Sequence, residues 1–264
     1  MQHYGFLLQL NRWFKTEGET VLKEERHLID AAIERLFGYF MVQLETINHQ
    51  SLMSASRVGH RVLLSSESAL IHAPREENEY LVLADLDFIP IAKDSVDLFL
   101  LPHTLELAED PLLLLRQIDA MLIAEGHLVI TGFNPRGAFV FWKRWFGRSK
   151  IFAEANLESA TTLTHWLRVL GYEITALKYT PAVFHPKADE RATPLWQRRL
   201  QSLMHRLGFG NVYCLMARKH QDAPTLVGMK WHTPRWRSLG ARTPASNRSH
   251  IRTTQQKEDY DRYN

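Results

Sequence analysis

A chain of 264 residues with 45% hydrophobic residues is long enough to bury one substantial core, which excludes a protein that is disordered throughout. The net charge of +3 is uneven, because residues 219–264 hold nine Lys and Arg against four Asp and Glu. The basic character therefore belongs to the C-terminal segment and is not the footprint of a nucleic-acid-binding domain. The single cysteine, Cys214, excludes a disulfide within the chain and is expected to be a buried thiol.

The N-terminal stretch MQHYGFLLQLNRWF shows neither a basic segment ahead of its short apolar run nor a small-residue cleavage site. The chain also lacks a run of about 18 uncharged apolar residues, so we expect a cytoplasmic protein without a transmembrane segment. Residues 18–37 place apolar side chains at mixed spacings of three and four, which predicts an amphipathic helix that ends at Gly38. This N-terminal helical segment, residues 1–38, is expected to pack on the domain that follows.

Short apolar runs separated by polar loops predict seven strands: YFMVQL (39–44), HRVLLS (60–65), YLVLAD (80–85), VDLFLL (96–101), HLVITGF (127–133), YEITALKY (172–179) and NVYCLMAR (211–218). Several are apolar at consecutive positions, as in strands buried on both faces of a parallel sheet. Helical patterns at 111–124 and 157–170 alternate with them, whereas the second and third runs lie too close together for a full helix. The alternation predicts a doubly wound, Rossmann-like α/β domain over residues 39–220.

Polar residues follow three of the predicted strands. Asp85 ends the third strand, His103 follows the fourth and Asn134 follows the fifth. In an open parallel sheet, ligands bind beyond the carboxyl ends of the strands. We therefore expect these three residues to lie along one ligand-binding edge.

The segment 84–135 resembles the class I S-adenosylmethionine-dependent methyltransferases of type 11, which carry the ordered elements D, LP, S-x-D, H-x-L-E, D-P, L-R and L-x-x-G-G. Here those elements stand as Asp85, Ile89-Pro90, Ser95-Val96-Asp97, His103-Thr104-Leu105-Glu106, Asp110-Pro111, Leu115-Arg116 and Leu122-x-x-Glu125-Gly126. More narrowly, LLPHTLELAEDP and EGHLVITGFNPRG look like a group of bacterial methyltransferase-like proteins of unassigned substrate. The resemblance covers residues 12–220 and implies a mainly parallel seven-stranded sheet with one antiparallel strand.

The resemblance also implies S-adenosylmethionine as cofactor and an unknown small-molecule or macromolecular methyl acceptor. In such folds the acidic residue after the third strand binds the adenine amino group, which implies Asp85, with a backbone contact from Leu86. The chain after the fourth strand borders the methionine part of the cofactor. That position implies Leu101, Pro102 and His103.

Two positions depart from the family pattern. The loop after the first strand should read acidic-x-Gly-x-Gly-x-Gly, so that the backbone approaches the cofactor closely. Residues 43–49 instead read QLETINH, which puts Gln43 and Glu45 beside the cofactor. The carboxylate at the end of the second strand, which binds both ribose hydroxyls in the family, is replaced by Ser65-Ser66, and Glu67 comes too late. Two interpretations follow: a methyltransferase, or a catalytically inactive methyltransferase-like domain that serves as a binding or scaffold protein.

Each catalytic candidate also has a structural interpretation. His103 can act as a general base, or it can cap the next helix or bond a backbone carbonyl. Asn134 can present its amide to a substrate amine, or form a turn with Pro135. Glu106, near the start of a helix, is explained by the helix dipole. The thirteen histidines show no spacing typical of a metal site, so no metal is expected.

Residues 138–150, AFVFWKRWFGRSK, interleave aromatic and basic side chains. We interpret them as a lid or packing element, with a membrane-surface helix or a base-stacking strip as alternatives. Residues 221–264 turn to Pro, Thr, Ser, Arg and His, which predicts a basic, mostly disordered tail. Nucleic-acid binding through this tail would be weak and would fall steeply with salt.

Overall fold

The computed structural model describes residues 2–16, 18–47, 50–66, 68–72, 75–137, 140, 156–181 and 210–220. All of them fall within one unit of the chain, Met1–Ala223, and the other unit, Pro224–Asn264, lies outside the described residues. The tail expected at 221–264 therefore also lies outside them. Of the aromatic segment 138–150, only Val140 is described, and it is buried.

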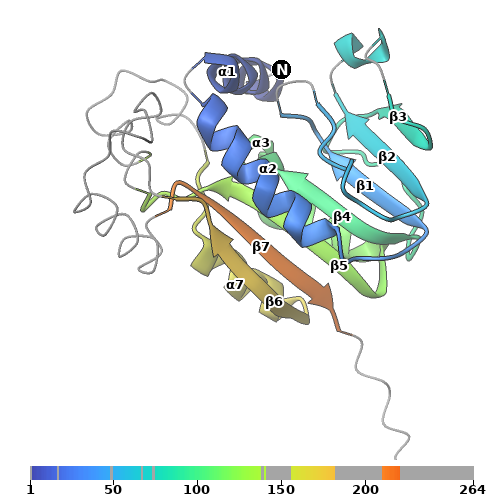
Figure 1. The fold of residues 1–264 in the computed structure, drawn as a ribbon. Helices are drawn as coiled ribbons and strands as arrows, with labels where there is room; N and C mark the ends of the chain where they lie inside the picture. The colour runs from blue at the N-terminus through green and yellow to red at the C-terminus, as the bar shows by residue number, and fades with distance from the viewer. Residues whose placement is uncertain are drawn as a thin grey trace, which may run out of the picture. The chain divides into compact units, whose positions relative to one another are not determined.

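A seven-stranded sheet forms the centre of the described fold (Figure 1). Its strands are β1 (Phe40–Leu44), β2 (His60–Ser65), β3 (Glu79–Leu83), β4 (Val96–Pro102), β5 (Leu122–Phe133), β6 (Tyr172–Tyr179) and β7 (Val212–Lys219). They lie in the order β3-β2-β1-β4-β5-β7-β6, in which β1 to β5 pair in parallel and β7 is antiparallel to both of its neighbours. The predicted mainly parallel sheet with one antiparallel strand is confirmed, and each strand overlaps its expected range.

The described helices are α1 (Gln2–Thr16), α2 (Glu19–Ile33), α3 (Thr104–Leu107), α4 (Pro111–Met121) and α7 (Ala160–Val169). The Asp110 side chain caps α4 by accepting two backbone N–H bonds, and the Ser159 side chain caps α7. Helix α4 ends before its expected limit at residue 124, because Leu122 already pairs with Val96 and begins β5. Among the described residues between β2 and β3, the helical element is a short 3-10 helix, Ser68–His72, in agreement with the short spacing of these strands.

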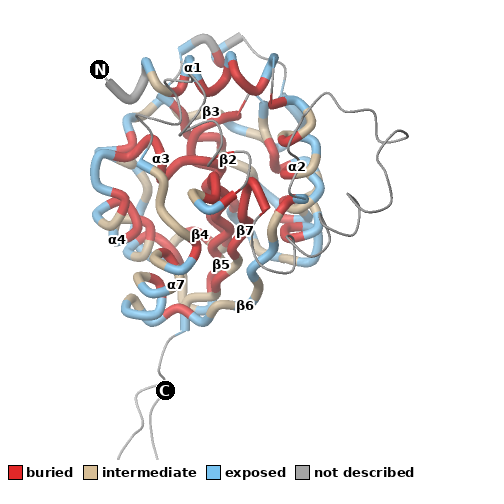
Figure 2. Tube along the Cα trace, turned by 90° about the vertical axis from the view of Figure 1, so that its left-hand side faces the viewer, coloured by how far each residue is buried: buried red, intermediate tan, exposed pale blue. Residues whose placement is uncertain are grey.

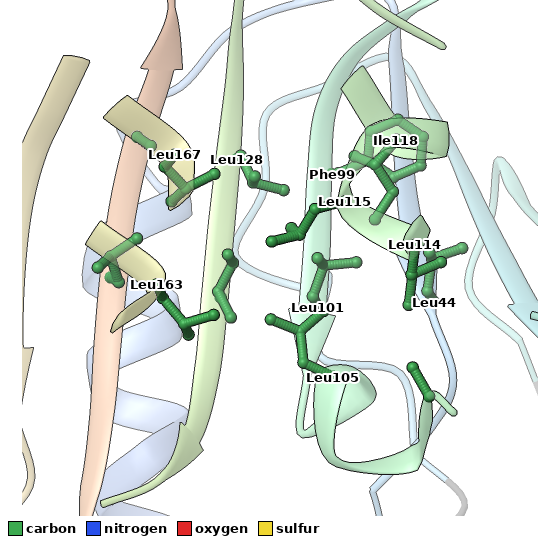
Figure 3. Packing of buried hydrophobic residues seen from close by; sticks show 14 of the residues in the cluster. Leu44, Phe99, Leu101, Leu105, Leu114, Leu115, Ile118, Leu128, Leu163 and Leu167 are labelled. Carbon is green, nitrogen blue, oxygen red and sulfur yellow. The ribbon is translucent and has the colours of Figure 1, made fainter. Parts of the chain in front are cut away.

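Helices cover both faces of the sheet (Figure 2). On one face, α4 and α7 contribute leucines to a core with the strands, as Leu115 and Leu167 show beside Phe99 and Leu128 (Figure 3). On the other face, α2 contributes Ile29 to a second core. Burial on both faces explains why the central strands are apolar at consecutive positions.

Helix α1 lies at the end of the sheet where the parallel strands finish (Figure 1). The Trp13 ring stands 5.5 Å from the Phe133 ring at the end of β5, and the Phe14 ring stands 5.4 Å from the His103 ring after β4. Helix α1 is thus packed directly over the edge at which ligands bind in open parallel sheets. Within the described part of the chain, no helix is both long and apolar enough to cross a membrane.

Candidate functional site

His103 stands at the carboxyl end of β4 with both ring nitrogens facing carboxylates. Its backbone has φ 52°, in the left-handed region, at the position before α3. Its Nδ1 lies 3.0 Å from Oε2 of Glu106 on α3, and its Nε2 lies 3.2 Å from Oε2 of Glu25 on α2. The His103 and Glu25 side chains are 0% exposed. The ring therefore neither caps α3 nor bonds a backbone carbonyl.

The two carboxylates around His103 are themselves hydrogen-bonded to β5. The hydroxyl of Thr131 donates to Oε1 of Glu25 at 2.5 Å, and the backbone N–H of Phe133 donates to Oε1 of Glu106 at 2.5 Å. Burial by itself lowers the pKa of His103, but the carboxylates of Glu106 and Glu25 outweigh it and raise that pKa to about 10. His103 is therefore a buried imidazolium that donates both N–H groups.

Aromatic rings of α1 and β5 surround this charged group. The Phe133 ring centre lies 4.2 Å from the His103 ring centre, and the Phe14 ring is stacked on the Phe133 ring at 5.9 Å. Phe14 and Phe133 are both buried. These contacts hold the imidazolium away from solvent, so the described arrangement suits a structural ion pair better than a base that exchanges protons with a substrate.

Glu45 follows β1 and reaches the end of β2. It has φ 63°, a left-handed conformation that glycine adopts without cost, and it stands where the family pattern has its first glycine. Its carboxylate accepts hydrogen bonds from the Ser65 hydroxyl at 2.7 Å, from the Ser66 hydroxyl at 2.8 Å and from the Ser66 N–H at 2.9 Å. The sequence did not predict this contact between the two positions that depart from the family pattern.

The loop after Glu45 is held inward by Gln43. The Gln43 amide donates to the backbone oxygen of Glu45 at 2.9 Å and accepts from the backbone N–H of Leu52 at 2.8 Å. Ile47, Leu52 and Met53 are buried and belong to the core under α2. Where the family pattern has its second glycine, this chain has Ile47, whose side chain is buried in that core.

The remaining candidate residues lie at the ends of β3 and β4. Asp85 is exposed just beyond β3, and Leu86 next to it is buried in the core. Leu101 and Pro102, the last residues of β4, are buried. The Thr104 hydroxyl donates to the backbone oxygen of Leu44 at 2.6 Å, which joins the ends of β4 and β1.

Asn134 forms a turn at the end of β5. Its side-chain oxygen accepts from the N–H of Arg136 at 3.1 Å, and its amide donates to the backbone oxygen of Gly210 at 2.9 Å. The backbone N–H of Gly137 returns to the carbonyl of Asn134 at 2.8 Å. These bonds give Asn134 the structural role that its position before Pro135 predicted.

Glu25 and Thr131 belong to the hydrogen-bonded group around His103, and the sequence did not single them out. In the sequence, Glu25 falls among the polar residues of the amphipathic helix predicted over 18–37, and the helix dipole accounts for Glu106. The signal for Glu25 is its spacing, because it falls four residues after Val21 and four before Ile29, on the buried stripe of α2. A carboxylate on an apolar stripe requires a buried partner.

Among the residues that the structure describes, no group of three or more His, Cys, Asp or Glu could hold a metal ion.

Cys214 is buried in β7, and burial raises the pKa of its thiol to about 12. The thiol is therefore protonated near neutral pH, in agreement with the prediction that it is structural.

Comparisons with known proteins agree with the topology. Residues 54–130, which extend from the loop before β2 into β5, match the family model of a methyltransferase domain. One similar solved structure is an S-adenosylmethionine-dependent methyltransferase of Thermotoga maritima, with 14% identity, 81% of this chain and 99% of that chain covered, and a TM-score of 0.57. Another is an S-adenosylmethionine-dependent methyltransferase of Mesorhizobium loti, with 16% identity, 74% of this chain and 97% of that chain covered, and a TM-score of 0.53. A third is a chain in the complex between the Haloferax volcanii Trm112 methyltransferase activator and a methyltransferase, with 17% identity, 81% of this chain and 99% of that chain covered, and a TM-score of 0.56. This chain has the fold of the class I methyltransferases.

The methyltransferase-like chain also has a relative among curated proteins. It is 35% identical over 142 residues to the uncharacterised protein YafS of Escherichia coli K12. The match covers 53% of this chain and 55% of YafS, so the chain spans about half the length of the curated relative it matches. Because YafS is itself uncharacterised, the similarity to it does not indicate an activity.

Two acidic residues at this edge stand at or near positions that the resemblance implies for the adenosine part of S-adenosylmethionine. Asp85 is exposed where an acceptor for the adenine amino group is expected, and the Glu45 carboxylate lies at the end of β2, where the family has its ribose-binding acid. The φ of Glu45 also keeps the backbone course of a first glycine. The rest of the glycine cradle is missing, because Ile47 takes the second glycine position and is buried.

Proposed function

We propose that this chain is an S-adenosylmethionine-dependent methyltransferase that acts on an unidentified acceptor. The observation that supports it is the match of residues 54–130 to a methyltransferase domain, within a sheet in which Asp85 follows β3 and Glu45 follows β1, the two strands on either side of β2. When bound, the cofactor supplies an activated methyl group. Methyl transfer needs mainly the correct placement of acceptor and methyl donor, so a proton-exchanging residue is not required at the edge.

In this proposal each residue has a positioning role. Asp85 accepts from the adenine amino group, and the backbone of Leu86 contacts the same base. Gln43 holds the loop after β1, as its bonds to Glu45 and Leu52 already do. The end of β4 at Leu101, Pro102 and His103 borders the site. Cytoplasmic location and bacterial origin are part of the proposal, supported by one buried thiol and by a relative in Escherichia coli.

The second candidate function is a methyltransferase-like domain that binds a partner without catalysis. It is favoured by the loop after β1, whose Ile47, Leu52 and Met53 are buried in the core instead of leaving a glycine cradle. The packing of Phe14 against His103 at the carboxyl edge favours it further. In this function the fold presents a surface and the edge takes no cofactor.

Calorimetric titration with S-adenosylhomocysteine separates the two functions. For the enzyme we expect saturable binding to the full chain that Asp85→Ala weakens by roughly tenfold or more, because one hydrogen bond from adenine to a charged carboxylate is lost. Asp87→Ala is the matched control, since Asp87 is a neighbouring exposed acid and should leave the affinity unchanged. An absence of heat and of thermal stabilisation at millimolar ligand would contradict the enzyme and support the binding domain.

The basic tail, residues 221–264, is proposed to lie outside the methyltransferase-like domain of residues 39–220 and the N-terminal helical segment of residues 1–38. Its excess of Lys and Arg supports weak, salt-sensitive association with polynucleotides. Deletion of residues 221–264 should remove any such association. If polynucleotide binding persists after the deletion, the tail does not carry it.

A further inference from the structure

The sheet ends at β3, which pairs with one neighbour among the described residues (Figure 1). This strand, Glu79–Leu83, pairs in parallel with β2 over all five of its residues and without a shift in register. An edge strand offers its backbone groups to a further strand unless a bulge, a proline or a lysine blocks it. Its residues, EYLVL, include neither proline nor lysine. The backbone of β3 is therefore suited to accept another strand.

Backbone groups of Leu81 and Leu83 point away from the sheet. The N–H of Ala84 donates to the carbonyl of Ser65 in β2 at 3.2 Å. Residues that bond a parallel neighbour alternate along a strand, so Val82 faces β2 in the same way as Ala84. The residues between them direct their N–H and carbonyl groups to the open side. A further strand would find its hydrogen-bonding partners there.

Large apolar side chains are exposed on both faces of this edge. Tyr80 is 51% exposed and Leu83 is 45% exposed, and their odd spacing places them on opposite faces of the sheet. On the face of Tyr80, the His60 ring centre lies 6.2 Å from the Tyr80 ring centre and 5.3 Å from that of Phe40. A strand added beside β3 would bury apolar surface on both of its faces.

The two ends of β3 are acidic. Residues 76–87, EENEYLVLADLD, hold five Asp and Glu and neither Lys nor Arg. Glu76 forms an ion pair with Arg61 at 2.8 Å. The other four acids are exposed or half-buried: Glu77, Glu79, Asp85 and Asp87. Opposite charges across a strand pair are stabilising, so these acids favour a partner strand with Lys or Arg at both ends.

The same acids oppose the pairing of β3 with β3 of a second copy. In an antiparallel pair centred on Leu81, residues 76–79 of one copy would lie opposite residues 83–87 of the other, acid against acid. In a parallel pair each acid would lie beside its own counterpart. Like charges that lie directly opposite destabilise a strand pair. The occupant that the charges favour is therefore a strand of a different, basic chain.

We propose that the open edge of β3 binds an extended segment of a partner protein, in which alternating apolar residues are flanked by Lys or Arg. The segment extends the sheet by bonding Leu81 and Leu83, packs against Tyr80, and places its basic ends beside the acids of residues 76–87. Nothing in this contact requires a cofactor, so its test is independent of the proposed function.

The probe is a synthetic peptide of alternating Val and Thr with Lys and Arg at both ends, and fluorescence anisotropy measures its binding to the full chain. One control peptide carries Asp and Glu at its ends, and another carries a central proline that removes a backbone donor. The wild type should bind the basic peptide saturably and each control at least about tenfold more weakly. Added salt should weaken the binding of the basic peptide.

Leu83→Lys tests the protein side of the contact. The substitution adds a charge of the same sign as the peptide and removes an exposed apolar contact, so the affinity should fall by about tenfold or more. Val169→Lys is the matched control, because Val169 is 74% exposed on α7, which packs on β6 at the opposite edge of the sheet. This variant should bind the peptide as the wild type does.

Amide hydrogen exchange of the wild type locates the peptide without any substitution. The amides of Leu81 and Leu83 should gain protection when the basic peptide binds. The amide of Val82, which already bonds β2, should change less. This measurement decides the matter even if Leu83→Lys fails to fold.

The proposal is overturned if the wild type does not bind the basic peptide, or if either control peptide binds equally well. Unchanged affinity in Leu83→Lys, or protection confined to residues outside β3, would overturn it too, because the peptide would then bind elsewhere. Analytical ultracentrifugation covers the remaining case. A dimer of the wild type that Leu83→Lys abolishes would mean that a second copy occupies the edge, against the proposal.

Discussion

Glu25 and His103 are 78 residues apart in the chain, yet the carboxylate Oε2 of one lies 3.2 Å from the imidazole Nε2 of the other. Both side chains are fully buried, and Glu106 holds the opposite ring nitrogen. Helix α2 is therefore joined to the carboxyl edge of the sheet by a charged contact as well as by apolar packing. A buried ion pair of this kind contributes little net stability, but removal of one partner lowers the free energy of unfolding strongly because it leaves an uncompensated buried charge.

Glu25→Ala is expected to lower the free energy of unfolding by about 3–5 kcal/mol, because it leaves the His103 imidazolium with one carboxylate and the Thr131 hydroxyl without an acceptor. Urea denaturation followed by circular dichroism measures the change. Glu19→Ala on the same helix is the control, since Glu19 pairs with Lys23 in solvent and should contribute little. Equal effects of the two substitutions would show that the buried contact does not stabilise α2.

Stability should fall as the pH rises above neutrality. The pKa of His103 is raised to about 10 from the ordinary 6.5, so the folded state binds this proton more tightly than the unfolded state. The stabilisation is fully present below about pH 6.5 and is lost as the pH rises through about 10. In His103→Asn, whose side chain tolerates φ 52°, the decline of the unfolding free energy between these limits should be smaller. Parallel curves for both proteins would exclude this assignment.

Gly132 should not tolerate a methyl group. A Cβ at Gly132 would lie 2.5 Å from the hydroxyl oxygen of Tyr213 and 3.0 Å from Oε1 of Glu106, and both side chains are buried. Gly132→Ala is therefore expected to destabilise the fold by about 1–3 kcal/mol through overpacking. Gly59→Ala provides the comparison, because its nearest neighbour would be 3.7 Å away. Thermal denaturation of the pair decides the matter, and a stable Gly132→Ala protein would mean that Tyr213 can move.

Most of the sheet could be predicted because its signals are local. Runs such as HRVLLS and YEITALKY are apolar, short and bounded by polar turns, and β2 and β6 coincide with them. The end of α4 and the start of β5 were harder to predict. The sequence PLLLLRQIDAMLIA is rich in apolar residues along its whole length, yet the chain changes from helix to strand at Leu122. Apolar composition indicates burial there and does not distinguish the two conformations.

The candidate site could be predicted only in part. Asp85 and His103 follow strand signals, so their place on the edge could be inferred. The contact of His103 with Glu25 could not be inferred, because Glu25 lies 78 residues away and no local pattern connects it with His103 or with Thr131, whose hydroxyl also bonds Glu25. The contact of Glu45 with Ser65 and Ser66 was also missed. Each position was compared separately with the family pattern, although the register of β1 with β2 brings them together.

The bond between Thr131 and Glu25, which spans 106 residues, orders events during synthesis. Helix α2 leaves the ribosome long before β5 does, and until then its Glu25 has neither His103 nor Thr131 to bind. The N-terminal helices can be helical early, but their final seating must wait for the middle of the chain. A nascent chain stopped before β5 would carry its first helices undocked and would be a natural target for chaperones.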